Sequence, residues 1–291
     1  MPRTAFLTLE ERGDFVMDDE LAHAPLRALG WEVEDVPWTR PGVDWSGYDV
    51  VVIRSPWDYH HQPVAFLSTL DEISARTRLE NDVGLVRWNY RKTYLRELQE
   101  LDVPIVPTVW RDGLAPGQLA ALHADVGSEE FVVKPVVGAG AEDAWRLDAA
   151  RVEQHGEEVE ALYAGRPLQA QPFVRSVVEE GEWSLIVFGG QLSHTLLKTP
   201  AAGDFRVQEE YGSRLAAVEP EASLRAACDT VLDALEALPL YARVDFVRGD
   251  DGRWWLMELE LIEPSLYLRM SEGAPERFAQ ALHERVRGAA R

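Results

Sequence analysis

Three carboxylates near the C-terminal end of the chain interrupt a segment that otherwise has the composition of a buried strand. The segment WWLMELELIEP, residues 254–264, places Glu258, Glu260 and Glu263 among Trp, Leu, Met and Ile. Carboxylates are costly to bury against an apolar core unless something compensates their charge. A second run, YARVDFVR, carries Asp245, and the GDDG between the two runs is a strong hairpin signal. These acidic residues are the first candidates for a functional site.

The hairpin predicts which of the carboxylates share a face. A loop with an even number of residues would pair Arg248 with Arg253 and place Asp245, Glu258 and Glu260 on one face. In this register Asp245 and Glu258 are diagonal neighbours, with Cβ atoms roughly 7 Å apart. Glu263 falls outside the set, so it either ends the strand or meets substrate. The opposite face would be wholly apolar, formed by Val244, Phe246, Trp255, Met257, Leu259 and Leu261.

Carboxylates gathered on one face require a compensating partner. Two of them about 5 Å apart repel by roughly 3 kcal/mol at an effective dielectric constant near 20. A divalent cation, an arginine or bulk water could offset this, and Arg243 on the same face could neutralise one charge. An all-oxygen set without nearby Cys or His favours Mg²⁺ or Mn²⁺ over zinc. Because Mg²⁺ is usually held by one or two carboxylates together with substrate phosphates, the set also suggests a phosphate-bearing substrate.

Lysines are scarce in this chain, which makes their positions informative. Only Lys92, Lys134 and Lys198 are lysines among the 29 basic residues, and the others are arginines. A lysine ammonium is a compact point charge suited to a phosphate contact, although three ordinary surface lysines are the alternative. Lys134 lies shortly before a glycine loop, Gly138 to Gly140.

Composition excludes several classes of function. The net charge of −21, from 50 acidic and 29 basic residues, disfavours nucleic acids and anionic membranes as partners. The apolar runs are too short to span a bilayer, and the N-terminus lacks a secretory layout. The single cysteine, Cys228, is expected as a buried apolar residue of a helix and fits a reducing cytoplasm. A cytoplasmic protein with small-molecule substrates is expected, and a homo-oligomer is among the assemblies left open.

The periodicity of apolar residues along the chain predicts the strands and helices that position these candidate residues. The first third alternates strand and helix, with strands at 4–9, 31–38 and 48–55 and helices at 18–30 and 63–77, which is typical of parallel βαβ units. Residues just past such strands are ligand candidates, so Arg54 and Ser55 are predicted to meet substrate. A helix over 87–104 would carry Lys92 in its first turn, and Gly189-Gly190 would turn a later hairpin.

The order of these motifs resembles the ATP-grasp superfamily. Lys92, the FVVKP of Lys134, the glycine loop, QPFV at 171–174 and the Asp…Glu-x-Glu hairpin follow in sequence. Within the superfamily the chain is similar to glutathione synthetase-like and ribosomal-protein glutamate ligase-like carboxylate–amine ligases. RSPW, VRWNYRKTYL, FVVKP and MELELIEPSLYL also resemble the O-ureido-serine cyclo-ligases of cycloserine biosynthesis. The resemblance covers nearly the whole chain.

The resemblance implies an α/β (α+β) ATP-grasp fold, with an N-terminal βαβ domain preceding two α+β ATP-binding subdomains. The expected boundaries are 1–88 for the substrate domain, 89–172 for the central subdomain with the glycine loop, and 173–291 for the C-terminal subdomain with the metal-binding hairpin. It also implies ATP and Mg²⁺ (or Mn²⁺) as cofactors. The residues expected to contact ATP are Lys92, Lys134, Gly138 and Gly140 at the phosphates, Gln171, Phe173 and Val174 at the adenine, and Glu182 at the ribose.

The same resemblance implies roles for the remaining candidates. Asp245, Glu258 and Glu260 would hold Mg²⁺, whereas Lys198 and Arg206 would steady the γ-phosphate and the carboxylate substrate. Three positions depart from the glutathione synthetase pattern: Ser184 and Lys198 replace arginines, and Glu260 replaces an asparagine. These departures speak against the glutathione reaction itself, but they leave ATP-grasp chemistry in place.

The implied activity is an ADP-forming ligase that activates a small carboxylate as an acyl phosphate and couples it to an amine or similar nucleophile. The alternative within enzymes is an intramolecular cyclo-ligase of the O-ureido-serine type. Two further classes are a metal-dependent hydrolase that uses the acidic cluster and a non-catalytic nucleotide-binding module. Hydrolysis without ATP consumption would indicate the first of these, and tight ATP binding without ADP release would indicate the second.

Overall fold

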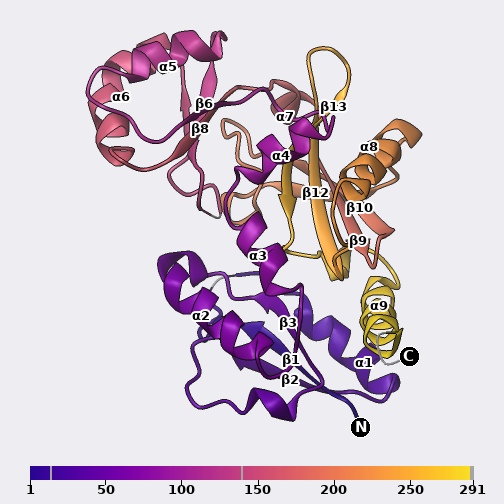
Figure 1. Ribbon diagram of the computed structural model, residues 1–291. Helices are drawn as coiled ribbons and strands as arrows, with labels where there is room; N and C mark the ends of the chain where they lie inside the picture. Colours follow the sequence, from indigo (N-terminus) through magenta and orange to yellow (C-terminus); the bar gives the residue numbers. More distant parts are fainter. Residues whose placement is uncertain (14, 139, 289–291) are drawn as a thin grey trace.

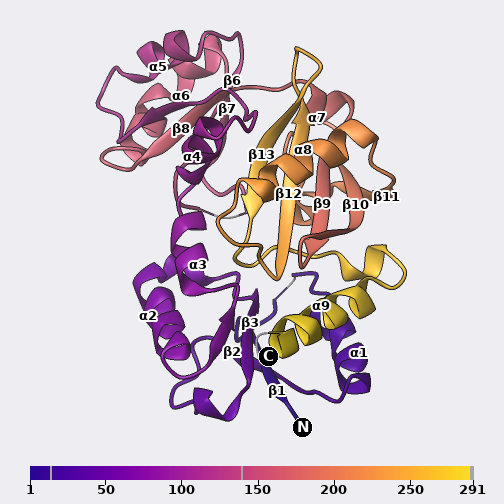
Figure 2. The same ribbon diagram turned by 45° about the vertical axis from the view of Figure 1, so that its right-hand side comes forward.

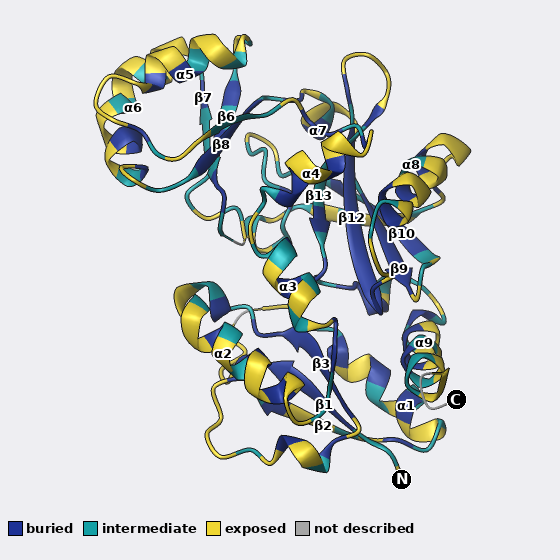
Figure 3. Ribbon diagram, viewed as in Figure 1, coloured by how far each residue is buried: buried dark blue, intermediate teal, exposed yellow. Residues whose placement is uncertain are grey.

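The computed structural model describes residues 1–13, 15–138 and 140–288. Three β-sheets dominate it, with a parallel sheet at one end of the molecule and two antiparallel sheets at the other (Figure 1). Helices pack on these sheets in the part of the chain that the structure describes. Each helix turns a buried face towards its sheet and an exposed face towards solvent (Figure 3). The alternating strand and helix predicted for the first third of the chain is confirmed.

The N-terminal sheet is parallel and has the order β2-β1-β3-β4. Every residue of β3 is buried, as its continuous apolar run predicts. Its strands are β1 (Arg3–Thr8), β2 (Glu32–Pro37), β3 (Val50–Ser55) and β4 (Arg78–Glu80), and its helices are η1 (Asp19–Ala22), α1 (His23–Ala28), η2 (Trp45–Gly47), η3 (Tyr59–His61), α2 (Pro63–Ser74) and α3 (Val83–Asn89).

A small antiparallel sheet with the order β5-β8-β6-β7 forms the upper left of Figure 1. Two helices pack on one of its faces around Phe131 and Tyr163, both fully buried. The elements are β5 (Val109–Arg111), α5 (Leu119–Val126), β6 (Phe131–Pro135), β7 (Trp145–Leu147), α6 (Ala149–Leu162) and β8 (Leu168–Pro172).

The third sheet is antiparallel, with the order β11-β10-β9-β12-β13. Gln191 lies opposite Phe188, so the two-residue turn predicted at Gly189-Gly190 is confirmed. Helix α8 covers one face and buries Cys228 there, as predicted (Figure 2). The elements are α7 (Ser176–Glu179), β9 (Glu182–Phe188), β10 (Gln191–Thr199), η4 (Glu209–Tyr211), β11 (Arg214–Val218), α8 (Ala222–Asp233), β12 (Tyr241–Arg248), β13 (Trp254–Glu260), η5 (Leu268–Met270) and α9 (Ala274–Gly288).

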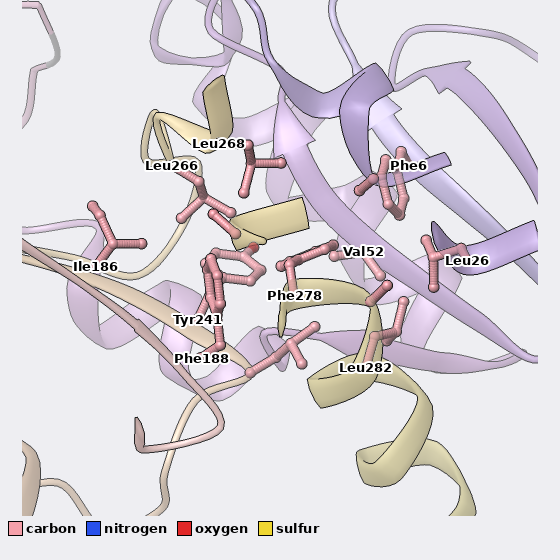
Figure 4. Packing of buried hydrophobic residues seen from close by; sticks show 14 of the residues in the cluster. Phe6, Leu26, Val52, Ile186, Phe188, Tyr241, Leu266, Leu268, Phe278 and Leu282 are labelled. Atoms are coloured by element: carbon pink, nitrogen blue, oxygen red, sulfur yellow. The ribbon is translucent and has the colours of Figure 1, made fainter. Parts of the chain in front are cut away.

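One hydrophobic cluster joins the N-terminal sheet to the five-stranded sheet through α9 (Figure 4). The Phe278 ring of α9 lies edge-on to Phe6 of β1 at 6.0 Å and to Phe188 of β9 at 5.4 Å. Burying three aromatic rings in one contact is a large hydrophobic contribution with a specific geometry. This cluster therefore fixes the position of the N-terminal sheet relative to the rest of the chain.

The helix predicted over 87–104 is interrupted. The structure has α3 up to Asn89 and a separate α4 (Tyr94–Glu100), and Lys92 lies in the connection between them. The Lys92 amide donates to the Val136 carbonyl at 2.9 Å, a contact to a segment outside the helix. A continuous helix would use that amide internally, so this tertiary contact replaces one turn of helix. Within the described residues, no helix has the length and apolar composition needed to cross a membrane.

Candidate active site

A β-bulge in the β12–β13 hairpin determines which side chains face the site. Near the turn Arg248 lies opposite Trp254, and Phe246 lies opposite Leu256, but Asp245 lies opposite Glu258. Met257 is therefore an additional residue in β13. The predicted pairing of Arg248 with Arg253 is wrong, because the turn is longer by one residue and the bulge then shifts the register back.

The bulge also changes the two faces of the hairpin. Leu256 packs in the core beneath α8, whereas Trp255 and Met257, both predicted on the apolar core face, pack beside Val247 on the other side. Met257 lines the cavity described below. Asp245, Glu258 and Glu260 still share one face, as predicted, since Arg243 lies opposite Glu260 and Asp245 lies opposite Glu258.

The free edge of β13 is covered by the connection that carries Lys92. The Asn89 amide donates to the Leu259 carbonyl at 2.8 Å, and the Tyr94 hydroxyl accepts from the Leu259 amide at 2.9 Å. Such contacts satisfy the unpaired groups of an edge strand. Because Asn89 and Tyr94 flank Lys92, they hold its ammonium against the neighbouring carboxylate of Glu258, with which it forms an ion pair.

Two further cations compensate the carboxylates on this face. The Arg243 guanidinium pairs with both Asp245, at 3.0 Å, and Glu260. It therefore contacts two carboxylates where the sequence predicted compensation of one. Lys198 Nζ lies 2.5 Å from Glu182 Oε1 and 3.5 Å from Asp245 Oδ1. These pairs compensate the negative charge of carboxylates that are largely removed from solvent.

The backbone beside Lys198 leaves room only for glycine. Gly181 has φ of +113°, and a Cβ there would approach the Lys198 carbonyl oxygen to 2.8 Å. Glycine alone adopts this conformation freely and allows such an approach. Gly181 therefore lets β9 begin directly beside Lys198, which places Glu182 within reach of the lysine.

Burial shifts the ionisation of several of these groups. Burial raises the pKa of Glu260 to about 7, although Arg243 opposes the shift. Burial alone would lower the pKa of Lys198, but Asp245 and Glu182 raise it. Burial lowers the pKa of Lys134, whose Nζ lies 3.8 Å from the Met257 sulfur. Lys134 is thus a half-buried cation that forms no ion pair with a carboxylate among the described residues, as a site for an anionic group requires.

A cavity of about 580 Å³ lies where the three sheets meet. This volume is within the range of small-molecule and cofactor sites. Asp245 lies beneath the cavity wall, 2% exposed, and pairs with the groups that line it. The predicted residues that line the cavity are Lys92, Lys134, Gly138, Gly140, Gln171, Phe173, Val174, Glu182, Lys198, Arg206, Glu258, Glu260 and Glu263.

One end of the cavity is formed by the small sheet and the glycine loop, whose Ala139 lies outside the described residues. The Phe173 amide donates to the Glu130 carbonyl at 2.9 Å, so this backbone donor is already used within the protein. The Arg146 guanidinium lies 3.6 Å from the centre of the Phe173 ring and fixes it in place. The aromatic face and the apolar Val174 then offer a surface for a flat ring.

Arg206 lies at the glycine-loop side of this cavity. Its guanidinium pairs with Asp204 at 2.8 Å and lies 3.6 Å from the centre of the Tyr211 ring. The Tyr211 hydroxyl donates to the Gly140 carbonyl at 3.1 Å. Arg206 is therefore connected to the glycine loop through a single tyrosine.

The opposite end of the cavity is formed by the N-terminal domain and by Glu263. Trp57, Tyr59 and His60 line it from the segment after β3. Tyr59 was missed in the sequence, although it closely follows the RSPW motif. Burial and the neighbouring Glu260 raise the pKa of Glu263 to about 8. His60 Nε2 lies 3.2 Å from Glu142 Oε2 of the glycine-loop segment, so the two ends of the cavity meet there.

Two predicted substrate residues are not in the cavity wall. Arg54 is 1% exposed, and its Nε donates to Asp19 at 3.0 Å while its Nη2 donates to the Pro264 carbonyl at 3.0 Å. Ser55 is fully buried. Arg54 has a structural role in place of the expected substrate contact, because it ties the end of β3 to η1 and to the segment after β13. The Ser55 hydroxyl has no hydrogen-bond partner among the described residues.

The donor set fits the predicted cation. Glu258 and Glu260 each keep about a quarter of their side-chain surface exposed, 27% and 28%, and both face the cavity. Two carboxylates opening onto a space for phosphate oxygens are the ligands that Mg²⁺ commonly uses. Asp245, directly opposite Glu258, supplies further negative charge from below.

Known proteins match this chain over nearly its whole length. The family model "D-cycloserine synthetase DcsG, N-terminal domain" matches residues 4–81. The cycloserine biosynthesis protein DcsG of Streptomyces lavendulae is 38% identical over 280 residues, covering 90% of this chain and 91% of the relative. The crystal structure of D-cycloserine synthetase DcsG superimposes with a TM-score of 0.81 at 34% identity, covering 98% of this chain and 99% of that one.

More distant proteins share the fold. A glutathione synthetase of Bordetella parapertussis is 26% identical over 242 residues, covering 81% of this chain and 72% of the relative. The ATP-grasp ligase PsnB, solved with a minimal precursor, Mg and ADP, superimposes with a TM-score of 0.66 at 17% identity and covers 98% of each chain. The predicted fold class is confirmed: an N-terminal parallel sheet precedes two antiparallel sheets in an ATP-grasp arrangement.

Proposed function

Because this chain belongs to the DcsG family of ATP-grasp ligases, we propose that it activates the carboxylate of a small amino acid of the O-ureido-serine type and closes a ring within that molecule. The observation that carries the proposal is the composition of the cavity. Lysines and paired carboxylates suited to Mg-ATP line one part, and the N-terminal domain lines the rest. The family model that matches this domain is that of a cycloserine synthetase.

We assign the nucleotide to the end of the cavity near the glycine loop. Lys92 and Lys134 supply positive charge for the phosphates, and the segment containing Gly138 and Gly140 lies beside them. Lys134, which forms no ion pair with a carboxylate among the described residues, would gain an anionic partner when a phosphate binds. The residues that would contact adenine and ribose are Gln171, Phe173, Val174 and Glu182.

Glu258 and Glu260 would hold Mg²⁺ or Mn²⁺ together with phosphate oxygens, with Asp245 below them. When bound, the cation neutralises charge on the phosphoryl group as it is transferred. The chain's own contribution is to keep three carboxylates on one face in a fixed arrangement. Arg243 and Lys198 do this by pairing with the carboxylates from the protein side.

The reaction balances without a covalent enzyme intermediate. A substrate carboxylate oxygen attacks the γ-phosphorus of ATP, ADP leaves, and an acyl phosphate forms. A nitrogen of the same substrate then attacks the acyl carbon, the bond to the phosphate oxygen breaks, phosphate leaves with the electron pair, and the nitrogen loses a proton. We assign Lys198 and Arg206 to the charge on the transferring group and on the substrate carboxylate. The walls of the cavity limit the access of water to the acyl phosphate.

The proposal is tested by ADP release in Mg-ATP with O-ureido-serine as the sole second substrate, followed by mass spectrometry. Ring closure predicts ADP release without an added amine and a product lighter than the substrate by one water. ADP release that appears only when a second amino acid is added would instead indicate intermolecular ligation, as in the glutathione synthetase relative's name. Absence of ADP release across amino acids, dipeptides and ureido acids would overturn the proposal.

A further inference from the structure

Glu263 differs from the carboxylates that β9 and β13 contribute to the cavity wall, because it forms no ion pair within the described part of the chain. Glu258 pairs with Lys92, Glu260 with Arg243, and Glu182 with Lys198. Among the described residues, none of the ion pairs includes Glu263. A carboxylate that is removed from water and left without a positive partner is costly for the protein. Such a group is a candidate for binding a cation that arrives with a ligand.

The position of Glu263 is fixed by side chains of the N-terminal domain and of β12. Trp57 Nε1 donates to the Glu263 carbonyl at 2.9 Å, and Arg54 Nη2 donates to the carbonyl of Pro264 at 3.0 Å. The Tyr241 hydroxyl donates to the Ile262 carbonyl at 2.8 Å. Side chains thus hold three successive backbone carbonyl groups, which fixes the backbone conformation at Glu263. With the backbone in this position, Glu263 lines the cavity.

The surroundings of Glu263 exclude other occupants. The hydroxyl of Tyr59, a residue 6% exposed, donates a hydrogen bond to the Glu263 carboxylate, and Tyr90 lies nearby, so both neighbours are uncharged. ATP is anionic, so its phosphates are repelled from this carboxylate and attracted to the lysines. The cation assigned to the nucleotide is held by Glu258 and Glu260, which belong to the strand before Glu263. A positively charged group of the second substrate therefore fits this position.

We propose that Glu263, with Tyr59 and Trp57 around it, forms a subsite for the ammonium group of the amino acid whose carboxylate is activated. This assignment rests on the function proposed above and names the residue that recognises the α-ammonium group of the amino acid. The substrate lies with its carboxylate towards Glu258, Glu260 and the transferred phosphoryl group, and with its ammonium towards Glu263. A charge-assisted hydrogen bond from the ammonium satisfies the carboxylate, and the neighbouring rings favour a cation.

The test compares two probes and two variants. The probes are O-ureido-serine and 3-(ureidooxy)propanoic acid, which lacks the amino group. Glu263→Gln keeps the shape and removes the charge, so KM for O-ureido-serine should rise about 10- to 100-fold, the effect expected for one charge-assisted hydrogen bond. The kcat for O-ureido-serine should change little. With the des-amino probe, kcat and KM of Glu263→Gln should stay within about threefold of the wild-type values, because that probe has no ammonium group to contact Glu263.

Glu263→Asp keeps the charge and should recover part of the affinity for O-ureido-serine, which a purely structural role would not produce. Glu210→Gln removes an exposed carboxylate from the glycine-loop end of the same cavity and should not discriminate between the probes. Equal losses with both probes in Glu263→Gln, or an unchanged KM, would overturn the ammonium subsite while the ligase activity of the wild type stands. Failure of the wild type to release ADP with either probe would overturn the proposed function, and this assignment with it.

Discussion

Asp245 lies directly opposite Glu258 across the β12–β13 ladder, and the bulge at Met257 is what places it there. With the same sequence but no bulge, the pairing set by the turn would put Asp245 opposite Met257, on the far side from the other two carboxylates. The bulge also brings Met257 into the cavity, where its sulfur lies 3.8 Å from Lys134 Nζ. One extra residue therefore sets both the acidic face and the wall next to it.

Removing the charge of Glu258 should abolish ADP release and preserve the fold. Glu258→Gln deletes a predicted metal ligand and the partner of Lys92, so we expect activity to fall on the order of 100-fold or more. The fold should persist because the change also removes the repulsion between Glu258 and Asp245. ADP release and circular dichroism measure the two effects.

Asp250→Asn is the matched control for this experiment, since it removes one exposed acidic charge from the turn of the same hairpin. Its ADP release should equal that of the wild type. Full activity in Glu258→Gln would refute the assignment of Glu258 to the metal.

Lys198 and Lys134 should differ in how strongly the stability of the fold depends on them. Lys198 is 3% exposed between Glu182 and Asp245, so Lys198→Met leaves the buried Glu182 without its ion-pair partner and Asp245 with Arg243 alone. We expect the free energy of unfolding to fall by about 3–5 kcal/mol. Lys134→Met removes a half-buried cation that forms no ion pair with a carboxylate among the described residues, so it should leave stability nearly unchanged and weaken ATP binding.

Urea denaturation measures the stabilities, and titration with ATP measures the affinities. The two variants are matched controls for each other because the same chemical change is made at two lysines of one cavity. Equal losses of stability would contradict the contrast, since they would mean that Glu182 and Asp245 do not depend on Lys198.

The sequence pattern predicted the acidic hairpin well but could not predict its bulge. The alternation of polar and apolar residues identified Asp245, Glu258 and Glu260 as one face, and this holds in the structure. Trp255 and Met257 suit a core face or a ligand cavity equally well by composition. The face of the sheet on which they lie is decided by packing against Val247 and by the contact of Met257 with Lys134. The first contact depends on the register of the hairpin, and the second comes from a distant part of the chain.

Long-range partners explain the other difference from the sequence prediction. Arg54 stands at the end of a parallel strand, where ligand-binding residues are common. Its guanidinium is instead taken by Asp19 and by the carbonyl of Pro264, 35 and 210 residues away. No local pattern indicates such contacts. The lysines were easier to interpret, because their scarcity alone marked them, and all three line the cavity.

Arg54 should therefore behave as a stabilising residue. Arg54→Met breaks a buried ion pair with Asp19 and a contact to Pro264, so we expect a loss of about 3–5 kcal/mol in the free energy of unfolding. Arg40→Met breaks an exposed pair with Glu34 and should change stability by no more than about 0.5 kcal/mol. Denaturant unfolding of both variants makes the comparison. A loss of activity without a loss of stability in Arg54→Met would restore the substrate role.

His194 should make stability depend on pH. Its ring is buried in β10, with Nε2 3.0 Å from the Leu266 carbonyl and Nδ1 2.9 Å from the Ser193 hydroxyl. This arrangement suits a neutral imidazole that donates from Nε2 and accepts at Nδ1. Burial lowers the pKa of His194 to about 4, a shift that the nearby Arg277 reinforces.

The sign of the effect follows from which state binds the proton. The unfolded chain protonates His194 below about pH 6.5, whereas the folded chain keeps it neutral down to about pH 4. Acidification through this window therefore favours unfolding, by up to about 1.4 kcal/mol per pH unit. His194→Gln cannot titrate, so its free energy of unfolding should fall less steeply between pH 6.5 and 4 than that of the wild type. Other titrating groups are common to both proteins and cancel in the difference. Denaturation curves measured at intervals across the window give this difference, and parallel pH profiles for the two proteins would show that His194 is protonated equally in the folded and unfolded states.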